Sequence, residues 1–345
     1  GYWRETLSKW RSEGHLTIEE EEGHQDGNSF DRSVSGKLGF DFNWQQMFQT
    51  NTSLYPHFET EVIAEFPDGS SHVRGGNGVV TVVNPSATGI PAHIDHLLKD
   101  RASWEKHYKH RYQISEGRID REMVEFYKER DLDTPLGLHC GSLFGHIRNV
   151  LGIEGVSYLY VDDEPLYREI INAVADLCYA NVEFLLTSGV SFDFAHFWED
   201  ICFKNGPLVS PSVFREYVGP HYNRITSLLR NYGIDIISLD CDGKIDSLIP
   251  IWFENGVNTM FPIEVGTWDA SIAPWREQYG RELRGVGGMN KTAFAHGRKA
   301  IDLELEKLKP LVDLGGYIPC PDHRIPPDAE WDTVRYYCDR MREEF

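Results

Sequence analysis

From Thr134 onward, short apolar runs alternate with longer segments in which apolar residues recur every three to four positions. The short runs are rich in β-branched residues and bounded by Gly, Pro or Asp, as is typical of strands buried on both faces of a parallel sheet. Ser210-Pro211 is a signal for the start of a helix, and Gly219-Pro220 should kink the helix that contains it. The pattern predicts strands at residues 135–140, 190–197, 234–239, 257–261, 283–288 and 316–320, and helices at about 142–151, 164–187, 211–231, 245–255, 271–279, 292–313 and 329–344.

Six strand–helix units in series, without a G-x-G-x-x-G turn, favour a (β/α)₈ TIM barrel, an α/β fold, over a nucleotide-binding sheet. We therefore expect one barrel domain over residues 1–345, with its two remaining strands supplied by residues before about 130 and by sequence upstream of Gly1. Alternation around the Asp68-Gly69 turn predicts an N-terminal β-hairpin insertion at about 55–90. Residues 2–13 predict an amphipathic helix, and residues 19–29 an exposed loop.

Acidic residues follow the predicted strands at their carboxyl ends, where parallel α/β folds bind ligands. Asp240 and Asp242 come directly after one strand, and Glu264 follows the next. Carboxylates that meet at one cavity raise one another's pKa unless a cation, a basic side chain or a cationic substrate compensates, and a metal ion is the simplest compensator. As an alternative, the Asp240–Gly243 stretch could be only a turn that caps a helix.

Other polar and aromatic residues fall at the same strand ends. Three prolines surround the Asp322-His323-Arg324 triplet, which indicates a rigid loop that presents these side chains. His139 has an ordinary reading, a polar strand end, because no second ligand lies at a diagnostic metal spacing. The candidate catalytic residues are Glu199, Asp200, Asp322 and His323, and the candidate substrate-binding residues are Trp198, Lys204, Trp268, Arg324 and His139.

Composition narrows the function classes. The formal charge of −20 and the lack of any Lys/Arg cluster argue against nucleic acid and anionic membranes as partners. The six cysteines are scattered singly, which favours reduced thiols and a cytoplasmic protein. We expect no membrane span, because no apolar run approaches about 18 residues.

Several motifs together resemble the uroporphyrinogen decarboxylase superfamily, in particular the uroporphyrinogen decarboxylase-like branch next to the cobalamin-dependent methyltransferases. They are YWRETLSKW, WEDICFKNGPLVSP, DCDG, FPIEVGTWD, GGMNK and GGYIPCPDHRIPPD, in this order along nearly the whole chain. The resemblance implies a TIM barrel with a deep cleft at the carboxyl ends of its strands, usually in a homodimer. It also implies one of two activities: cofactor-free decarboxylation of a porphyrinogen, or zinc-dependent methyl transfer that involves a corrinoid.

Departures from the family pattern favour the methyl-transfer activity over the decarboxylation. The chain opens with GYWRETLSKW, where the decarboxylases carry an arginine-rich segment that holds substrate carboxylates. The places of the methyltransferase zinc ligands correspond to Asp240, Asp242 and His323, with Glu264 or Glu199 to complete the set. The leading hypothesis is thus a methyltransferase that moves a methyl group between a small methylated donor, such as an O-methyl compound, and a corrinoid (cobalamin) on a partner protein. A lyase of the decarboxylase type, or a non-catalytic tetrapyrrole or corrinoid binder, are the alternatives.

Overall fold

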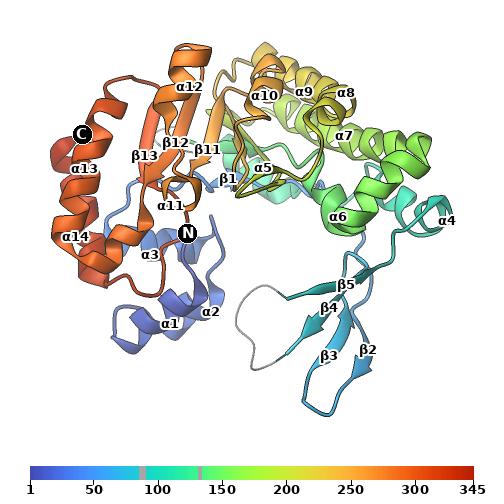
Figure 1. The fold of residues 1–345 in the computed structure, drawn as a ribbon, viewed down its shortest axis with the longest axis horizontal. Coiled ribbons are helices and arrows are strands. Elements are labelled where there is room, and N and C mark those ends of the chain that lie inside the picture. Colours follow the sequence, from blue (N-terminus) through green and yellow to red (C-terminus); the bar gives the residue numbers. More distant parts are fainter. Residues whose placement is uncertain (85–90, 131–133) are drawn as a thin grey trace.

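A seven-stranded parallel sheet forms the centre of the molecule (Figure 1). The computed structural model describes residues 1–84, 91–130 and 134–345. The strands lie in the order β1-β6-β7-β10-β11-β12-β13, so that consecutive strands of the second half of the chain are neighbours. Their bounds are β1 Met47–Phe48, β6 Gly137–His139, β7 Phe194–Trp198, β10 Ile237–Asp240, β11 Thr259–Ile263, β12 Arg284–Met289 and β13 Tyr317–Pro321.

All six predicted strands are present, and β1 is a seventh that comes from before residue 130, as expected. The described residues contain seven parallel strands, and no ladder among them joins β13 to β1, so a closed barrel of eight strands stays a prediction. The sheet nevertheless curves, because side chains from β1, β7 and β12 meet in one buried cluster of Trp44, Met47, Phe194 and Val286. The architecture is a parallel α/β fold compatible with a TIM-barrel-like arrangement.

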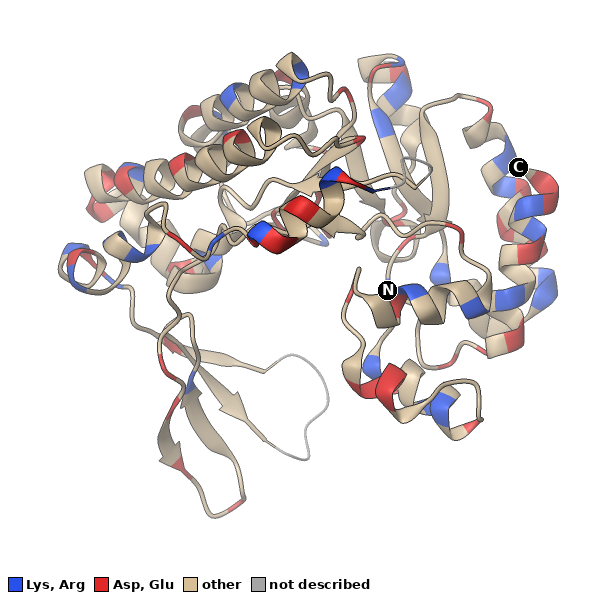
Figure 2. Cartoon of the chain, turned by 180° about the vertical axis from the view of Figure 1, so that it is seen from behind, with Lys and Arg blue, Asp and Glu red and all other residues tan. Residues whose placement is uncertain are grey.

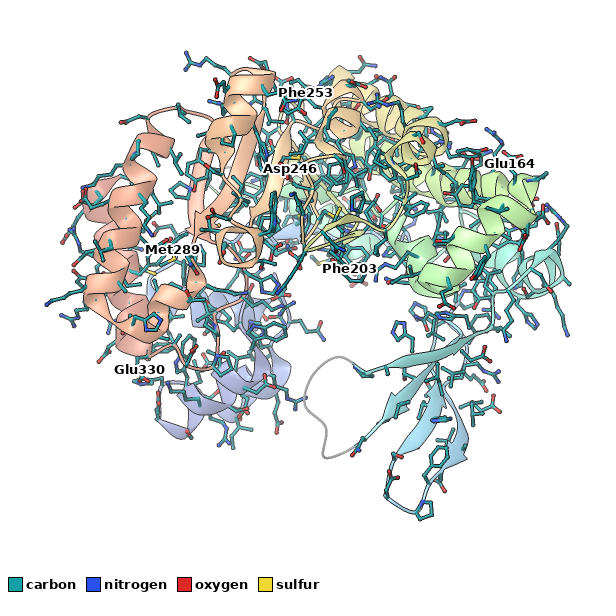
Figure 3. All side chains as sticks on the ribbon, viewed as in Figure 1. Glu164, Phe203, Asp246, Phe253, Met289 and Glu330 are labelled. Atoms are coloured by element: carbon teal, nitrogen blue, oxygen red, sulfur yellow. The ribbon has the colours of Figure 1, made fainter. Side chains whose placement is uncertain are left out.

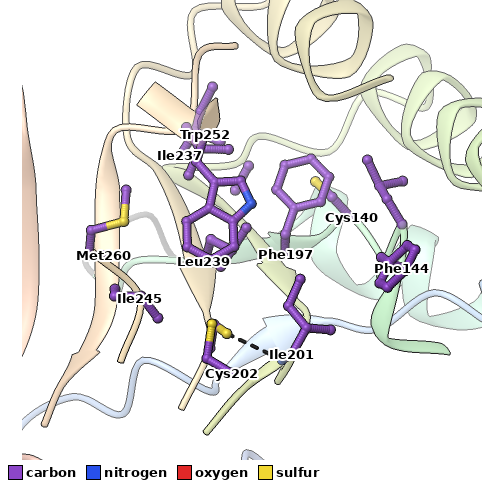
Figure 4. Packing of buried hydrophobic residues seen from close by; sticks show 14 of the residues in the cluster. Cys140, Phe144, Phe197, Ile201, Cys202, Ile237, Leu239, Ile245, Trp252 and Met260 are labelled. Atoms are coloured by element: carbon purple, nitrogen blue, oxygen red, sulfur yellow. Dashed lines mark hydrogen bonds between the residues drawn. The ribbon is translucent and has the colours of Figure 1, made fainter. Parts of the chain in front are cut away.

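Helices cover the outer face of this sheet (Figure 1). The predicted helix at 211–231 is broken at Gly219 into two, as the Gly-Pro pair requires. Between sheet and helices lies the main core, where Phe197, Leu239 and Trp252 are fully buried (Figure 4). The helices are α6 Gly145–Asp162, α7 Glu164–Thr187, α8 Pro211–Tyr217, α9 Gly219–Asn231, α10 Ile249–Glu254, α11 Val265–Trp268, α12 Ile272–Tyr279, α13 Arg298–Val312 and α14 Trp331–Glu344, with a 3₁₀ turn η3 at Lys291–His296.

Helix α7 begins at Glu164, labelled in Figure 3, and is long and apolar enough to cross a membrane by length and composition. This corrects the expectation that no apolar segment reaches that length. Its most apolar window is 56% buried inside the fold, and the helix packs against α6 and α9. Such burial is what a core helix of an α/β fold requires, and it accounts for the composition.

The N-terminal segment forms three helices that lie beside α13 and α14 (Figure 1): α1 Arg4–Ser12, α2 Ile18–Gly23 and α3 Ser29–Leu38. The expected loop at 19–29 is therefore wrong in its first half. Thr17 and Glu20 form a reciprocal capping box that begins α2 within the acidic run. Trp10 anchors the segment against Trp331 of α14, with ring centroids 5.1 Å apart.

The predicted hairpin insertion is a four-stranded antiparallel sheet that projects from the body (Figures 1 and 2). Its strands are β2 Glu61–Glu65, β3 Ser71–Arg74, β4 Val79–Val83 and β5 His93–His96, so the insertion extends beyond the predicted limit. Residues 85–90 of the predicted range lie outside the described residues. The remaining elements are α4 Arg101–Ser103, a π turn η1 at Trp104–Tyr108, a 3₁₀ turn η2 at Lys109–Tyr112, α5 Arg121–Lys128, and the small hairpin β8 Cys202–Phe203 and β9 Gly206–Pro207.

Candidate functional site

A cavity of about 240 Å³ lies at the carboxyl ends of the parallel strands. Its wall includes the last residues of β7, β10 and β13 and the segment that precedes β1. Two kinds of side chain dominate the wall. The carboxylates are Asp26, Asp200, Asp240 and Asp242, and the aromatic rings are Tyr2, Phe40, Phe42, Trp44, Trp198 and Phe261.

Asp240 and Asp200 are two carboxylates of the cavity wall, and Arg148 lies near the second of them. Asp240 ends β10 and accepts a hydrogen bond from Gln45 Nε2 at 3.2 Å. Asp200, two residues beyond β7, adopts a left-handed backbone (φ 49°), a strained conformation that clusters at functional sites. Arg148 donates to the Asp200 backbone oxygen at 2.6 Å but comes only to 3.4 Å of its carboxylate. The side chains of Asp240 and Asp200 both lie in the cavity wall.

Burial and mutual repulsion raise the pKa of these carboxyl groups. For Asp240, burial raises the pKa well above its usual range, the charge of Asp242 raises it further, and the Gln45 hydrogen bond acts in the opposite direction. For Asp200, burial raises the pKa, Asp242 adds to the effect, and Arg148 opposes it. Either group can thus keep a proton at a pH where an exposed aspartate has lost it, as a general acid must.

His323 and Arg324 are the basic residues of the cavity wall, and both already have acidic partners. His323 Nε2 lies 3.4 Å from Asp242 Oδ2, and the His323 ring stacks on Trp3 with centroids 5.7 Å apart. Arg324 forms a salt bridge with Asp26. The predicted rigid loop after β13 therefore presents these two side chains at the cavity.

Three histidines lie near the end of the sheet that carries Asp240: His196 is buried, and His139 and His146 are half-buried. Of the three, only His139 was given a role from the sequence. His139 of β6 and His196 of β7 are neighbours in strand register. Burial lowers the pKa of His139 and of His146 to about 4 and that of His196 to about 3, so all three rings are neutral. His196 Nε2 has no hydrogen-bond partner in the part of the chain that the structure describes, and it lies 4.0 Å from Asp240 Oδ2.

The hydrogen bonds of Ser238 indicate which nitrogen of His196 carries the proton. Ser238 Oγ donates to the backbone oxygen of Ala195 at 3.0 Å and accepts from Trp44 Nε1 at 3.1 Å. A hydroxyl has one proton, so its 2.7 Å bond to His196 Nδ1 is satisfied when Nδ1 is the donor. Nε2 is then a bare lone pair directed toward Asp240, and His196 brings no positive charge to the cavity.

Glu199, a predicted catalytic residue, does not line the cavity. Its side chain is fully buried and accepts from the backbone N–H groups of Leu143, Phe144 and Gly145 at 2.9, 3.0 and 2.6 Å. The hydroxyls of Ser142 and Tyr222 donate to it as well. Glu199 thus caps the first turn of α6, where a carboxylate satisfies orphan donors and the helix dipole.

Two more predicted acids also hold loops together outside the cavity wall. Glu264 accepts from Gly243 N at 2.5 Å and from Thr267 Oγ1 at 2.9 Å. Asp322 accepts from Gly266 N at 2.7 Å and from Lys291 N at 3.0 Å. Each carboxylate joins the loops that follow different strands, and this fixes the shape of the cavity. The other predicted residues that do not line the cavity are Lys204, which is exposed on the β8–β9 hairpin near Phe203 (Figure 3), Trp268 and His139.

The proposed zinc ligands do not fit a zinc site as they stand. In the described part of the chain, no three His, Cys, Asp or Glu side chains come together closely enough to hold a metal ion. Asp240 is engaged by Gln45, Glu264 by Gly243 and Thr267, and only Asp242 and His323 pair directly. A closed zinc site needs four ligands and a catalytic one three. We therefore derive no step of the reaction from a metal.

Sequence reasoning missed the part of the cavity wall that precedes β1. Phe42, Trp44 and Gln45 line the cavity, and so does Asp26 from the loop before α3. The available signal was a run of aromatic and amide side chains, FNWQQ, between a helix and an apolar pair. Such a run is unusual for a loop that only faces solvent.

Comparisons with known proteins show a shared fold. No protein-family model and no curated protein sequence matches this chain. Among solved structures, it is similar to a methyltransferase from Methanosarcina mazei, with a TM-score of 0.50, 13% identity, and coverage of 74% of this chain and 73% of that one. A protein described as a vitamin-B12 independent methionine synthase, from Listeria monocytogenes, overlaps with a TM-score of 0.39, 13% identity, and coverage of 66% and 70%.

At 13% identity the Methanosarcina overlap establishes likeness of fold alone, and the weaker overlap adds no argument. The Methanosarcina overlap supports a TIM-barrel-like α/β fold, which this chain shares with that methyltransferase. The resemblance of the sequence to the uroporphyrinogen decarboxylase superfamily is confirmed by no family model. Function must therefore be argued from the cavity.

Proposed function

We propose that this protein is a methyltransferase that takes a methyl group from a small methylated compound and passes it to a corrinoid carried by a separate protein. The observation that carries the proposal is the small, acidic, aromatic cavity at the carboxyl ends of the strands, in a fold shared with a methyltransferase. At about 240 Å³ it lies below the range of about 300–1,000 Å³ of pockets for drug-sized ligands. It suits a donor of a few heavy atoms.

The cavity is too small for the corrin macrocycle. The corrinoid therefore has to stay on its partner protein and approach the opening of the cavity from outside. The residues of this chain would bind and orient the donor. Asp200 is the candidate acid, because burial raises the pKa of its carboxyl group, and Asp240, with Gln45 and His196 as its neighbours, would face the donor. General acid catalysis of this kind contributes about 10²–10⁴-fold to a rate.

A decarboxylase of polycarboxylate substrates is the poorer assignment. Four carboxylates line the cavity, and its two basic residues, His323 and Arg324, are already paired with Asp242 and Asp26. A negatively charged substrate would meet repulsion and find no free cation.

The homodimer that the sequence resemblance implies stays a prediction, which light scattering of the purified protein tests.

Methyl transfer is tested with cob(I)alamin as acceptor and a panel of small N-methyl and O-methyl compounds, followed through the absorbance change on methylation of the corrinoid. We expect turnover with at least one donor, and a loss of about 10²-fold or more in Asp240→Asn or Asp200→Asn. Asp313→Asn is the matched control, because it removes the same charge from an exposed position. Full activity of both cavity variants, or no turnover with any donor, would refute the proposal.

A further inference from the structure

When Asp240 is ionised, the charges in the cavity wall do not balance without a ligand. Arg324 is engaged by Asp26 and His323 by Asp242, and Arg148 reaches Asp200 from outside the wall. Among the described residues, Asp240 has no basic partner within salt-bridge distance other than the neutral ring of His196. The cavity thus contains one carboxylate for which the protein supplies only a neutral amide, that of Gln45.

Within the described parts of the chain, the side chains closest to Asp240 supply no positive charge. His196 is 1% exposed, is neutral, and directs an unpartnered Nε2 lone pair toward the Asp240 carboxylate. The carboxylates that act on Asp240 through space, Asp242, Asp200 and Asp26, are all repulsive. When Asp240 loses its proton, we therefore expect the compensating cation to come from a ligand in the cavity.

The remainder of the wall is suited to methyl groups that carry positive charge. Six aromatic side chains line a space of about 240 Å³, among them Trp44 and Trp198. Ring faces attract cations within about 6 Å, most strongly when both are desolvated, and cages of this kind recognise quaternary ammonium ligands. The Trp44 indole N–H is already used by Ser238, so that donor is not available to a neutral oxygen acceptor.

We propose that the donor bound here is a methylated ammonium cation, a quaternary or N-methylated amine, with Asp240 as its counter-ion and the aromatic rings around its methyl groups. The inference rests on the proposed function and names its substrate class. A methyl ether of the same size has no positive charge, and its oxygen only accepts hydrogen bonds. It would need Asp240 protonated, whereas the cation needs Asp240 ionised, and the two classes therefore differ in how their binding responds to pH.

Binding is tested by calorimetry with two probes of one shape, choline and 3,3-dimethylbutan-1-ol, which replaces the charged nitrogen by carbon. We expect choline to bind at least about tenfold more tightly than the alcohol to the wild type. In Asp240→Asn the preference should disappear through weaker binding of choline, while Asp313→Asn retains it. Choline binding should also strengthen as pH rises and release protons, because burial and the neighbouring Asp242, Asp200 and Asp26 keep Asp240 protonated in the free protein.

Equal affinity for the two probes in the wild type, or a preference that survives in Asp240→Asn, would overturn the inference. If Asp240→Asn does not fold, a comparison of Trp198→Leu with Trp198→Phe takes its place. The leucine variant should lose the preference for choline, and the phenylalanine variant should keep most of it. The binding experiment contains no acceptor, so it is separate from the test of methyl transfer. Choline bound without turnover of any amine refutes the transferase alone, and turnover of methoxy donors without a choline preference refutes the ammonium class alone.

Discussion

Replacement of Glu199 by Gln removes one charge in the fold while keeping the size of the side chain. The carboxylate accepts five hydrogen bonds, from the backbone N–H groups of Leu143–Gly145 and from the hydroxyls of Ser142 and Tyr222. An amide brings an NH₂ group to one of the two oxygen positions. Hydroxyls can rotate to accept from it, but a backbone N–H cannot. In either orientation, at least one of the three backbone N–H groups of Leu143–Gly145 loses its partner.

The magnitude follows from these contacts. A lost hydrogen bond to a charged group costs about 1.5–3 kcal/mol, and the interaction with the helix dipole adds up to about 2 kcal/mol in a buried setting. We expect Glu199→Gln to lower the free energy of unfolding by about 1.5–5 kcal/mol. With an unfolding entropy of about 2.1 cal/mol/K per residue over 345 residues, the Tm falls by about 2–7 °C.

Thermal unfolding by circular dichroism and urea titration measure the change. Glu277→Gln, on the exposed side of α12, is the matched control and should remain within about 0.5 kcal/mol of the wild type. A Tm of Glu199→Gln within about 1 °C of the wild type would refute the capping role. Loss of turnover at an unchanged Tm would instead show that Glu199 acts as a catalytic acid, as the sequence first indicated.

Three further predictions concern protons and metal. His139, His146 and His196 are held neutral in the folded protein, whereas the same rings bind protons in the unfolded chain as the pH falls. The free energy of unfolding should therefore decrease as pH drops from about 6.5 to about 4. The decrease is about 1.4 kcal/mol per pH unit for each ring. Urea titrations at several pH values in this range should show a weaker dependence of the free energy of unfolding on pH for His196→Gln than for the wild type. An unchanged pH dependence would contradict the prediction. Asp240, whose folded pKa is raised, destabilises the protein as pH rises above about 4, so Asp240→Asn should have a higher Tm than the wild type at pH 8 and a similar one at pH 4. Metal analysis after incubation with excess zinc should find well below one equivalent, and one equivalent that His323→Ala removes would restore the zinc hypothesis.

The fold of residues 134–345 was largely predictable because its signals are local. A strand buried on both faces leaves a short apolar run between turn residues, and β10 and β11 are both recognisable in this way. The positions of Asp240 and Asp242 at a ligand-binding end follow from the same pattern, since side chains just past such runs meet at one edge of the sheet. The break at Gly219 was likewise visible in the sequence.

The rest depends on contacts between distant segments. Strand β1 has two residues and no pattern of its own; it is a strand only because Met47 and Phe48 pair with β6. Glu199 at the end of a strand looks the same in the sequence as a catalytic acid. Only the position of α6, 54 residues earlier in the chain at Gly145, identifies it as a cap.

Part of the cavity wall is formed by residues that lie far apart in the sequence. Tyr2 pairs with Ile325, Thr6 Oγ1 donates to the backbone oxygen of Ile325 across 319 residues, and Arg324 binds Asp26. Contacts of such sequence separation carry the largest loop-closure entropy and form late in folding. During synthesis the sheet can assemble strand by strand, but the cavity cannot select a ligand until the segment after β13 has emerged. The partly made protein therefore has a core before it has a binding site.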